Sequence, residues 1–193
     1  MSNQISTIHN PDKRQDNDVL VKVVSNEVLP AFKAYYPSSD FSWRGNLMMF
    51  ANEYAKQLYG MNILVVHVRA ALESARLRSA TERHPPNPIE FKVLCLHARG
   101  MPTLEQCMSE INEQRIKNYG ENKEWSEPLV YWLNQQIAGA RATLADNSWQ
   151  KMAKNRYTEL AEIYGKGELS PIPLKIEYNA PPAYLKYAGN GHG

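Results

Sequence analysis

The stretch RHPPNPIEF, residues 83–91, interrupts a chain whose apolar residues otherwise recur at helical spacing. It places three prolines within four positions, so no regular helix can run through it. Asn87 can accept hydrogen bonds from the turn that follows, and Pro88 fits the first helical position, where no N–H is needed. Glu90 can reach back to the N–H of Asn87. We therefore predict a stiff connector over residues 83–86 and a new helix that begins at Asn87.

Apolar residues at helical spacing also precede the connector, and they predict three helices there. The first of these should end or kink at Pro30, and Gly60 suits the left-handed position after the second. We expect the three helices to begin at Asp16, at a cap formed by Ser39 or Asp40, and at a cap formed by Asn62.

After the connector, the same spacing and further capping residues predict four helices. They run from Pro88 to Arg99 before Gly100, from a capping box at Thr103–Gln106 to Gly120, from Ser126-Glu127-Pro128 to about Ala140, and from about Asn147 to Gly165. Residues 16–165 should therefore form an all-α bundle of six or seven helices, with a possible sub-boundary near 100–103 or 120–126.

The two ends of the chain differ from this helical part. Residues 1–15 are polar and without period, and residues 166–193 contain four prolines and no helical period. We expect a flexible N-terminal arm and an extended C-terminal tail. No stretch approaches the roughly 20 apolar residues of a membrane span, and the N-terminus lacks the apolar core of a signal peptide. With two cysteines, a cytoplasmic location is the default expectation.

No pattern of catalytic or cofactor-binding residues stands out. Gly165-Lys166 lacks the upstream glycine and the following Ser/Thr of a phosphate-binding loop. Cys95 and His97 face apart on a helix, so we expect Cys95 and Cys107 to be buried packing residues rather than zinc ligands. The six glutamates between residues 105 and 127 are typical of a solvated helix face. We therefore predict a protein that is not an enzyme, with no catalytic residue, metal or cofactor.

Three arginines, Arg69, Arg76 and Arg83, are spaced seven apart and should lie nearly in one line on the third helix. This line borders the apolar stripe that contains Val68 and Leu72. Arginines in such a position present their guanidinium groups to acidic partners or phosphates, or pair with acids of their own fold. The sequence leaves these alternatives open.

The C-terminal tail interleaves lysines with tyrosines. Bases of single-stranded DNA could stack on the tyrosines while the lysines contact phosphates. The same proline-containing segment could instead lie along a groove of a protein partner, or remain disordered. The residues concerned are Lys175, Tyr178, Tyr184, Lys186 and Tyr187.

The run RGNLMMFANEYAKQLYGMNILVVHVRAALESARLRSATERHPPNPIEFKVLC resembles the central region of the lambda-type bacteriophage replication protein P family, the phage helicase loaders. The resemblance spans about residues 19–178 and also includes YWL (131–133) and GELSPIPLKIEY (167–178). The region around Leu47 lacks an expected tryptophan, and the N-terminal arm matches nothing in the family. The matching positions are Arg44, Gly60-Met61, Val68, Ala75-Arg76, Pro86-Asn87-Pro88-x-Glu90-Phe91 and Cys95.

The resemblance implies a protein that binds the host's hexameric replicative helicase (DnaB-type), holds its ring open and inactive, and delivers it to an origin with a phage initiator. Proteins of that family do this without an ATPase site. The alternatives are a helicase inhibitor with the same binding mode and a stand-alone DNA-binding module. The helicase-binding candidates are Arg69, Arg76, Arg83, Trp132, Trp149, Tyr178 and Tyr184, and the candidates for single-stranded DNA are Lys175, Lys186 and Tyr187.

Overall fold

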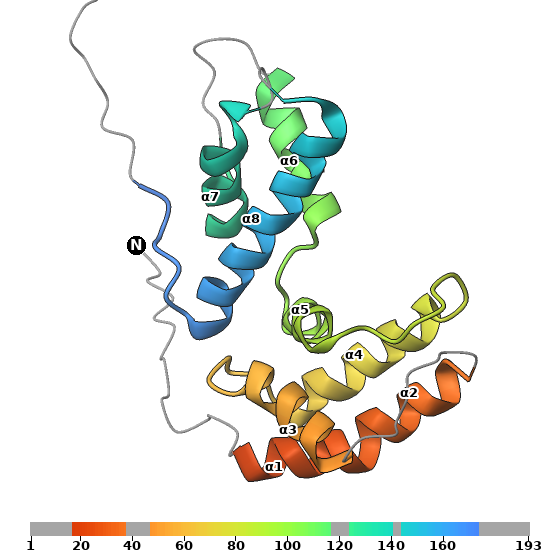
Figure 1. The fold of residues 1–193 in the computed structure, drawn as a ribbon. Helices are drawn as coiled ribbons and strands as arrows, with labels where there is room; N and C mark the ends of the chain where they lie inside the picture. Colours follow the sequence, from red (N-terminus) through yellow and green to blue (C-terminus); the bar gives the residue numbers. More distant parts are fainter. Residues whose placement is uncertain (1–16, 38–46, 117–123, 141–143, 174–193) are drawn as a thin grey trace, which may run out of the picture.

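The computed structural model describes residues 17–37, 47–116, 124–140 and 144–173 of the 193-residue chain. All regular elements in these ranges are helical, which confirms the expected all-α fold (Figure 1). The elements are α1 (Asn17–Val23), the π-helical segment η2 (Val24–Val28), α2 (Leu29–Tyr35), α3 (Leu47–Leu58), α4 (Val65–Arg78), α5 (Pro88–Ala98), α6 (Leu104–Ile116), α7 (Pro128–Ile137) and α8 (Asp146–Lys166).

The helices form two groups that meet at α5. Helices α1 to α4 lie together on one side, α6 to α8 lie on the other, and α5 is seen end-on between them in Figure 1. Helix α5 packs against α3 and α4 in the first group and against α8 in the second. Buried apolar side chains from Leu20 to Ala161 form one continuous cluster, so the two groups share a core.

The predicted capping box at the start of α5 is confirmed. Asn87 Oδ1 accepts hydrogen bonds from the N–H groups of Ile89 and Glu90, both at 3.0 Å, and Glu90 Oε2 accepts from Asn87 N–H at 3.0 Å. The connector is held from the other side as well, because the buried Tyr54 hydroxyl donates to Pro86 O at 2.7 Å. The direction of α5 is thus fixed both by its own first turn and by α3.

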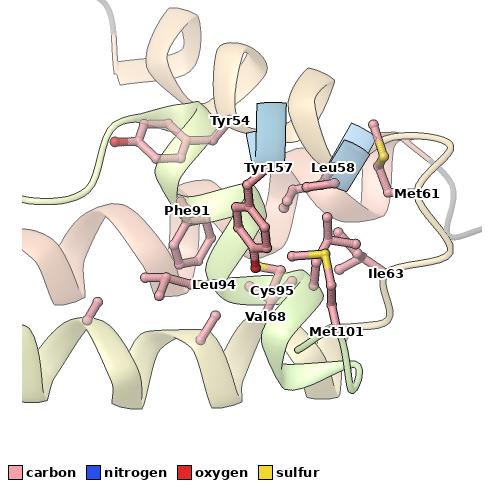
Figure 2. Close-up of a cluster of buried hydrophobic side chains, with 14 of the residues drawn as sticks. Tyr54, Leu58, Met61, Ile63, Val68, Phe91, Leu94, Cys95, Met101 and Tyr157 are labelled. Atoms are coloured by element: carbon pink, nitrogen blue, oxygen red, sulfur yellow. The ribbon is translucent and has the colours of Figure 1, made fainter. Parts of the chain in front are cut away.

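Phe91, in the first turn of α5, carries this direction into the core. Its ring lies edge-on to Phe32 at 5.3 Å between centroids and to Tyr54 at 5.9 Å. Figure 2 shows Phe91, Tyr54 and Cys95 within this buried cluster. Cys95 and Cys107 are both free and buried, as predicted, and burial raises the pKa of the Cys107 thiol to about 12. Both cysteines are therefore packing residues of the core.

We predicted that the first helix would end or kink at Pro30, and in the structure it does not end there. Six residues before the proline the helix widens into the π-helical segment η2, and Leu29 N–H donates to Val24 O instead of to the carbonyl four residues before Leu29. A proline ring in a helix ordinarily clashes with the carbonyl four residues before it, here that of Asn26, and the widened turn relieves this clash. The helix therefore continues to Tyr35.

Other helix ends agree with the sequence only in part. The capping box of Thr103 and Gln106 is confirmed, with hydrogen bonds of 2.7 and 3.2 Å, and Gly60 has the expected positive φ of 78°. The prediction that Asn62 caps the third helix is wrong. Helix α4 begins after Leu64, whose N–H donates to His67 Nδ1 at 3.1 Å. His67 thus accepts from the N-cap residue, as Glu90 does in α5, and no N-cap side chain accepts from the first turn of α4.

Gly165 does not end the last helix, which continues to Lys166 and stops at Gly167, in the left-handed conformation at φ 74°. Gly165 is instead buried where α8 meets the loop after α3. A Cβ placed on it would overlap Met61 Sδ. The glycine is therefore a close-packing position rather than a terminator.

Candidate interaction surface

Helix α4 has one buried and one exposed side, and its exposed side is apolar at both ends. Val66 and Leu77 are 62% and 63% exposed, and they are eleven residues apart, about three turns, so they lie on the same side. Ala70 lies between them and is exposed as well. Glu73 is exposed on this side too. We call Val66, Arg69, Ala70, Glu73, Arg76 and Leu77 the α4 outer face.

Arg69 borders this face and is held in place by an acid from another element. Its Nε donates to Glu27 Oε2 at 2.8 Å and its second guanidinium nitrogen to Glu27 Oε1 at 2.9 Å. This paired hydrogen bonding lowers the pKa of the Glu27 carboxyl. The Arg69 side chain remains 63% exposed, so the guanidinium is fixed in direction and still accessible.

Arg76 pairs with Glu73 one turn earlier on the same helix. Arg83 does not continue the line of arginines, because α4 ends at Arg78 and the chain turns there through hydrogen bonds from Thr81 and Glu82 to Arg78 O. The prediction of three arginines in one helical line is therefore wrong in its third member. Arg83 lies exposed in the connector, beside a shallow depression lined by Tyr35 and Tyr36.

The aromatic residues expected as anchors fall into different environments. Trp132 on α7 is half-buried, and its indole N–H donates to Ser170 O at 2.8 Å. Trp149 on α8 is only 8% exposed and belongs to the core, so it is not available as a surface anchor. Its position on the buried stripe of α8 explains this, because the stripe also contains Ala153 and Tyr157. Tyr178 and Tyr184, with Lys175, Lys186 and Tyr187, lie outside the described residues.

A charged contact between α5 and α8 was not foreseen from the sequence. Lys92 is 4% exposed, and its Nζ donates to Glu162 on α8 and, at 3.2 Å, to Gln57 Oε1 on α3. Burial opposes ionisation of Glu162, but the hydrogen bonds from Lys92 and Lys166 outweigh it and lower the Glu162 pKa. The available signal was a single lysine inside the otherwise apolar run FKVLCL.

Arg99, directly after α5, makes a second contact between the two groups. Its guanidinium donates to Tyr164 O and Gly165 O, each at 3.0 Å, and to Met61 O. The first two carbonyls belong to the last turn of α8, where a cation complements the helix dipole. Lys92 and Arg99 together fix α8 against the α3–α5 group.

A third contact involves His97 and Tyr157 beside a polar surface depression. The Tyr157 hydroxyl donates to Pro102 O at 2.7 Å and therefore accepts from His97 Nε2–H at 2.6 Å. Burial lowers the His97 pKa and so favours the neutral ring. Both groups are engaged with each other and with the backbone, which is the arrangement of a structural contact.

Within the described ranges, no three His, Cys, Asp or Glu side chains are grouped so that they would hold a metal ion. None of the described helices combines the length and the apolar character needed to cross a membrane. Comparisons with protein-family models, with curated proteins and with solved structures find no match to this chain.

Proposed function

We propose that this chain is a phage-type replication initiation factor that binds the host's hexameric replicative helicase, holds its ring open and inactive, and loads it at an origin with a phage initiator. It acts by binding, without ATPase chemistry of its own, in the cytoplasm of a bacterial host. A helicase inhibitor with the same binding mode is the alternative.

The α4 outer face is the observation that carries the proposal. Val66 and Leu77 are exposed on one side of a helix beside two arginines, and an exposed apolar patch rimmed by charged residues marks an interaction site in many soluble proteins. The face is also rigid, because Arg69 is tied to Glu27 and α4 is followed by the capped connector. A rigid surface loses little conformational entropy on docking.

The sequence resemblance supplies the identity of the partner. Its motif Asn87-Pro88-x-Glu90-Phe91 begins α5 and packs Phe91 against Phe32 of α2 and Tyr54 of α3. For a ring that opens and closes, only a difference in affinity between the two states shifts the equilibrium. We propose that the α4 outer face contacts a helicase surface accessible in the open ring.

The proposal is tested by size-exclusion chromatography with light scattering on the full chain mixed with hexameric helicases of the DnaB type from a panel of bacteria. We expect a complex at micromolar concentration with at least one of them, and suppression of its DNA unwinding. Adding initiator and origin DNA distinguishes a loader, which restores unwinding, from an inhibitor.

A substitution on the face locates the contact. Leu77→Asp should weaken the complex about tenfold or more, as expected for a central interface residue. Ile116→Asp on α6 is the matched control, because Ile116 is an exposed apolar residue (83%) far along the chain from α4. Absence of any complex across the panel, with salt-dependent binding to DNA alone, would favour a DNA-binding module instead.

A further inference from the structure

Three helices of this chain begin in the same way, with a side chain of the first turn that accepts a hydrogen bond from the N–H of the residue before the helix. The acceptor is Glu90 in α5, at 3.0 Å, and Gln106 in α6, at 2.7 Å. In α4 it is His67, whose Nδ1 accepts from Leu64 N–H at 3.1 Å. Of these three side-chain types, histidine is the one that ordinarily changes its charge between pH 5 and 8.

Protonation of the His67 ring removes this acceptor. In the neutral ring Nδ1 has a lone pair and Nε2 carries the hydrogen, whereas both nitrogens of the imidazolium are donors. The hydrogen bond from Leu64 N–H is then lost. The new positive charge also lies in the first turn of a helix, where the helix dipole opposes it. Protonation of His67 therefore disfavours the start of α4 in two ways.

His67 has no substitute at this helix start. The N-cap residue of α4 is Leu64, which has no side-chain acceptor, unlike the asparagine and the threonine at the same position of α5 and α6. Within the part of the chain that the structure describes, only His67 supplies a side-chain acceptor there. The preceding segment passes through two left-handed residues, Gly60 at φ 78° and Asn62 at φ 51°, so it does not lead into α4 as a preformed helix.

The surroundings of the ring favour its neutral form. Burial lowers the His67 pKa, and so does the charge of Arg99, which directly follows α5. Among the described residues, Arg99 is the charged side chain from a neighbouring element that acts on this ring, and its guanidinium stays ionised at every relevant pH. The cap is therefore complete above pH 6.5, the ordinary pKa of a histidine, and is lost as the pH falls further.

Buried residues on both sides confine the effect to a short stretch. Ile63 and Val68 are both buried and belong to the cluster shown in Figure 2, so they hold the chain before and after the cap. Val66 lies between them, exposed at one end of the α4 outer face, and Leu77 lies at the other end. Loss of the cap can therefore displace Val66 without unfolding the bundle.

We propose that His67 is a proton-sensitive cap, whose protonation releases residues 64–67 from their helical arrangement and takes Val66 out of the α4 outer face while the other helices stay folded. This switch is a property of the free chain, and it is tested without a partner. Only its consequence, weaker helicase binding in acid, rests on the proposed function.

The test follows the backbone amides of the full chain by ¹⁵N NMR between pH 7.5 and 5. The Leu64 amide reports on the contact with His67, and the Asn87 amide, bonded to Glu90, is the control within the same molecule. We expect the Leu64 signal to titrate with His67. Its protection against hydrogen exchange, corrected for the intrinsic rate, should fall about fivefold, as for the loss of one helix cap. The Asn87 amide should keep its protection.

Two substitutions of His67 and one control separate the cap from other effects of pH. His67→Gln keeps an acceptor at every pH and should abolish the response of the Leu64 amide. His67→Ala removes the acceptor and should lower the protection of Leu64 at both ends of the pH range. His97→Gln is the matched control, because His97 contacts Tyr157 and not the start of α4, and it should leave the Leu64 response unchanged.

A Leu64 amide that does not respond to pH, an equal response in His67→Gln, or an equal loss of protection at Asn87 would overturn the proposal. The last of these outcomes would show that acid unfolds the chain as a whole. If His67→Ala does not fold, the comparison of the wild type with His67→Gln decides the question.

Discussion

Replacing Glu162 by glutamine should destabilise the protein much more than replacing its partner Lys92 by methionine. The two side chains differ in their surroundings, since the Lys92 side chain is 5% exposed and that of Glu162 is 36% exposed. Glu162 also has a second cation, Lys166, at 3.0 Å. Glu162→Gln therefore leaves a buried ammonium without its counter-charge, whereas Lys92→Met leaves a half-exposed carboxylate that keeps Lys166 and water.

The expected magnitudes follow from this difference. Leaving a buried charge unpaired costs about 3–5 kcal/mol, and we place Glu162→Gln near the lower end, about 3 kcal/mol, because the amide still accepts a hydrogen bond. Replacing Lys92 by an apolar side chain of similar length should cost less than about 1 kcal/mol. For a chain of this size, 3 kcal/mol corresponds to a fall in Tm of roughly 6–12 °C.

Urea unfolding at pH 7, followed by circular dichroism, gives the free energies. Glu159→Gln is the matched control on α8, because its pair with Arg156 is exposed on both sides and should change stability by less than about 1 kcal/mol. The lowered Glu162 pKa adds a pH signature. The ionised Glu162 carboxylate contributes fully to the free energy of unfolding above pH 4.5, the ordinary pKa of a glutamate, and this contribution is lost as the pH falls further. If Lys92→Met costs as much as Glu162→Gln, the reasoning is refuted.

Three further predictions concern helix caps and buried groups. Asn87→Ala should lower the free energy of unfolding by about 1 kcal/mol by removing the cap of α5, whereas Asn155→Ala, at an exposed position of α8, should not lower it. Equal urea midpoints for the two variants would contradict this. Burial lowers the pKa of both His67 and His97, so stability should fall as the pH drops through 6.5, and glutamine at either position should flatten that slope in urea titrations between pH 5 and 7.5. Both cysteines should resist a thiol reagent such as DTNB until the protein unfolds, and a fast reaction of the folded protein would show that they are accessible.

The parts of the fold that were predictable depend on short-range signals. The capping boxes at Asn87 and Thr103 and the positive φ of Gly60 each rest on residues within three or four positions of one another. The start of α4 was misplaced because the side-chain acceptor there lies inside the helix and not at the residue before it. Asn62 is the commoner cap, but the chain bends there with a φ of 51°, and the His67 ring supplies the acceptor.

The candidate surfaces were less predictable because they depend on distant partners. Glu27 and Arg69 are 42 residues apart, and Lys92 and Glu162 are 70 apart, so no local pattern connects them. The helical period placed Trp149 on an apolar stripe, but it did not distinguish a core residue from an exposed anchor. Only the packing of α8 against its neighbours settles that distinction.

The π-helical turn before Pro30 has a consequence for insertions and deletions in the first helix. Up to the end of this turn the buried positions fall every fourth residue, at Leu20, Val24 and Val28, and after it they restart one residue later, at Leu29, Phe32 and Tyr36. The wide turn thus corrects the phase of the inward-facing stripe by a single residue. Deleting one residue there would restore a uniform α-helix, yet it would also return the proline ring to the carbonyl that the wide turn avoids, so the two features are tolerated only together.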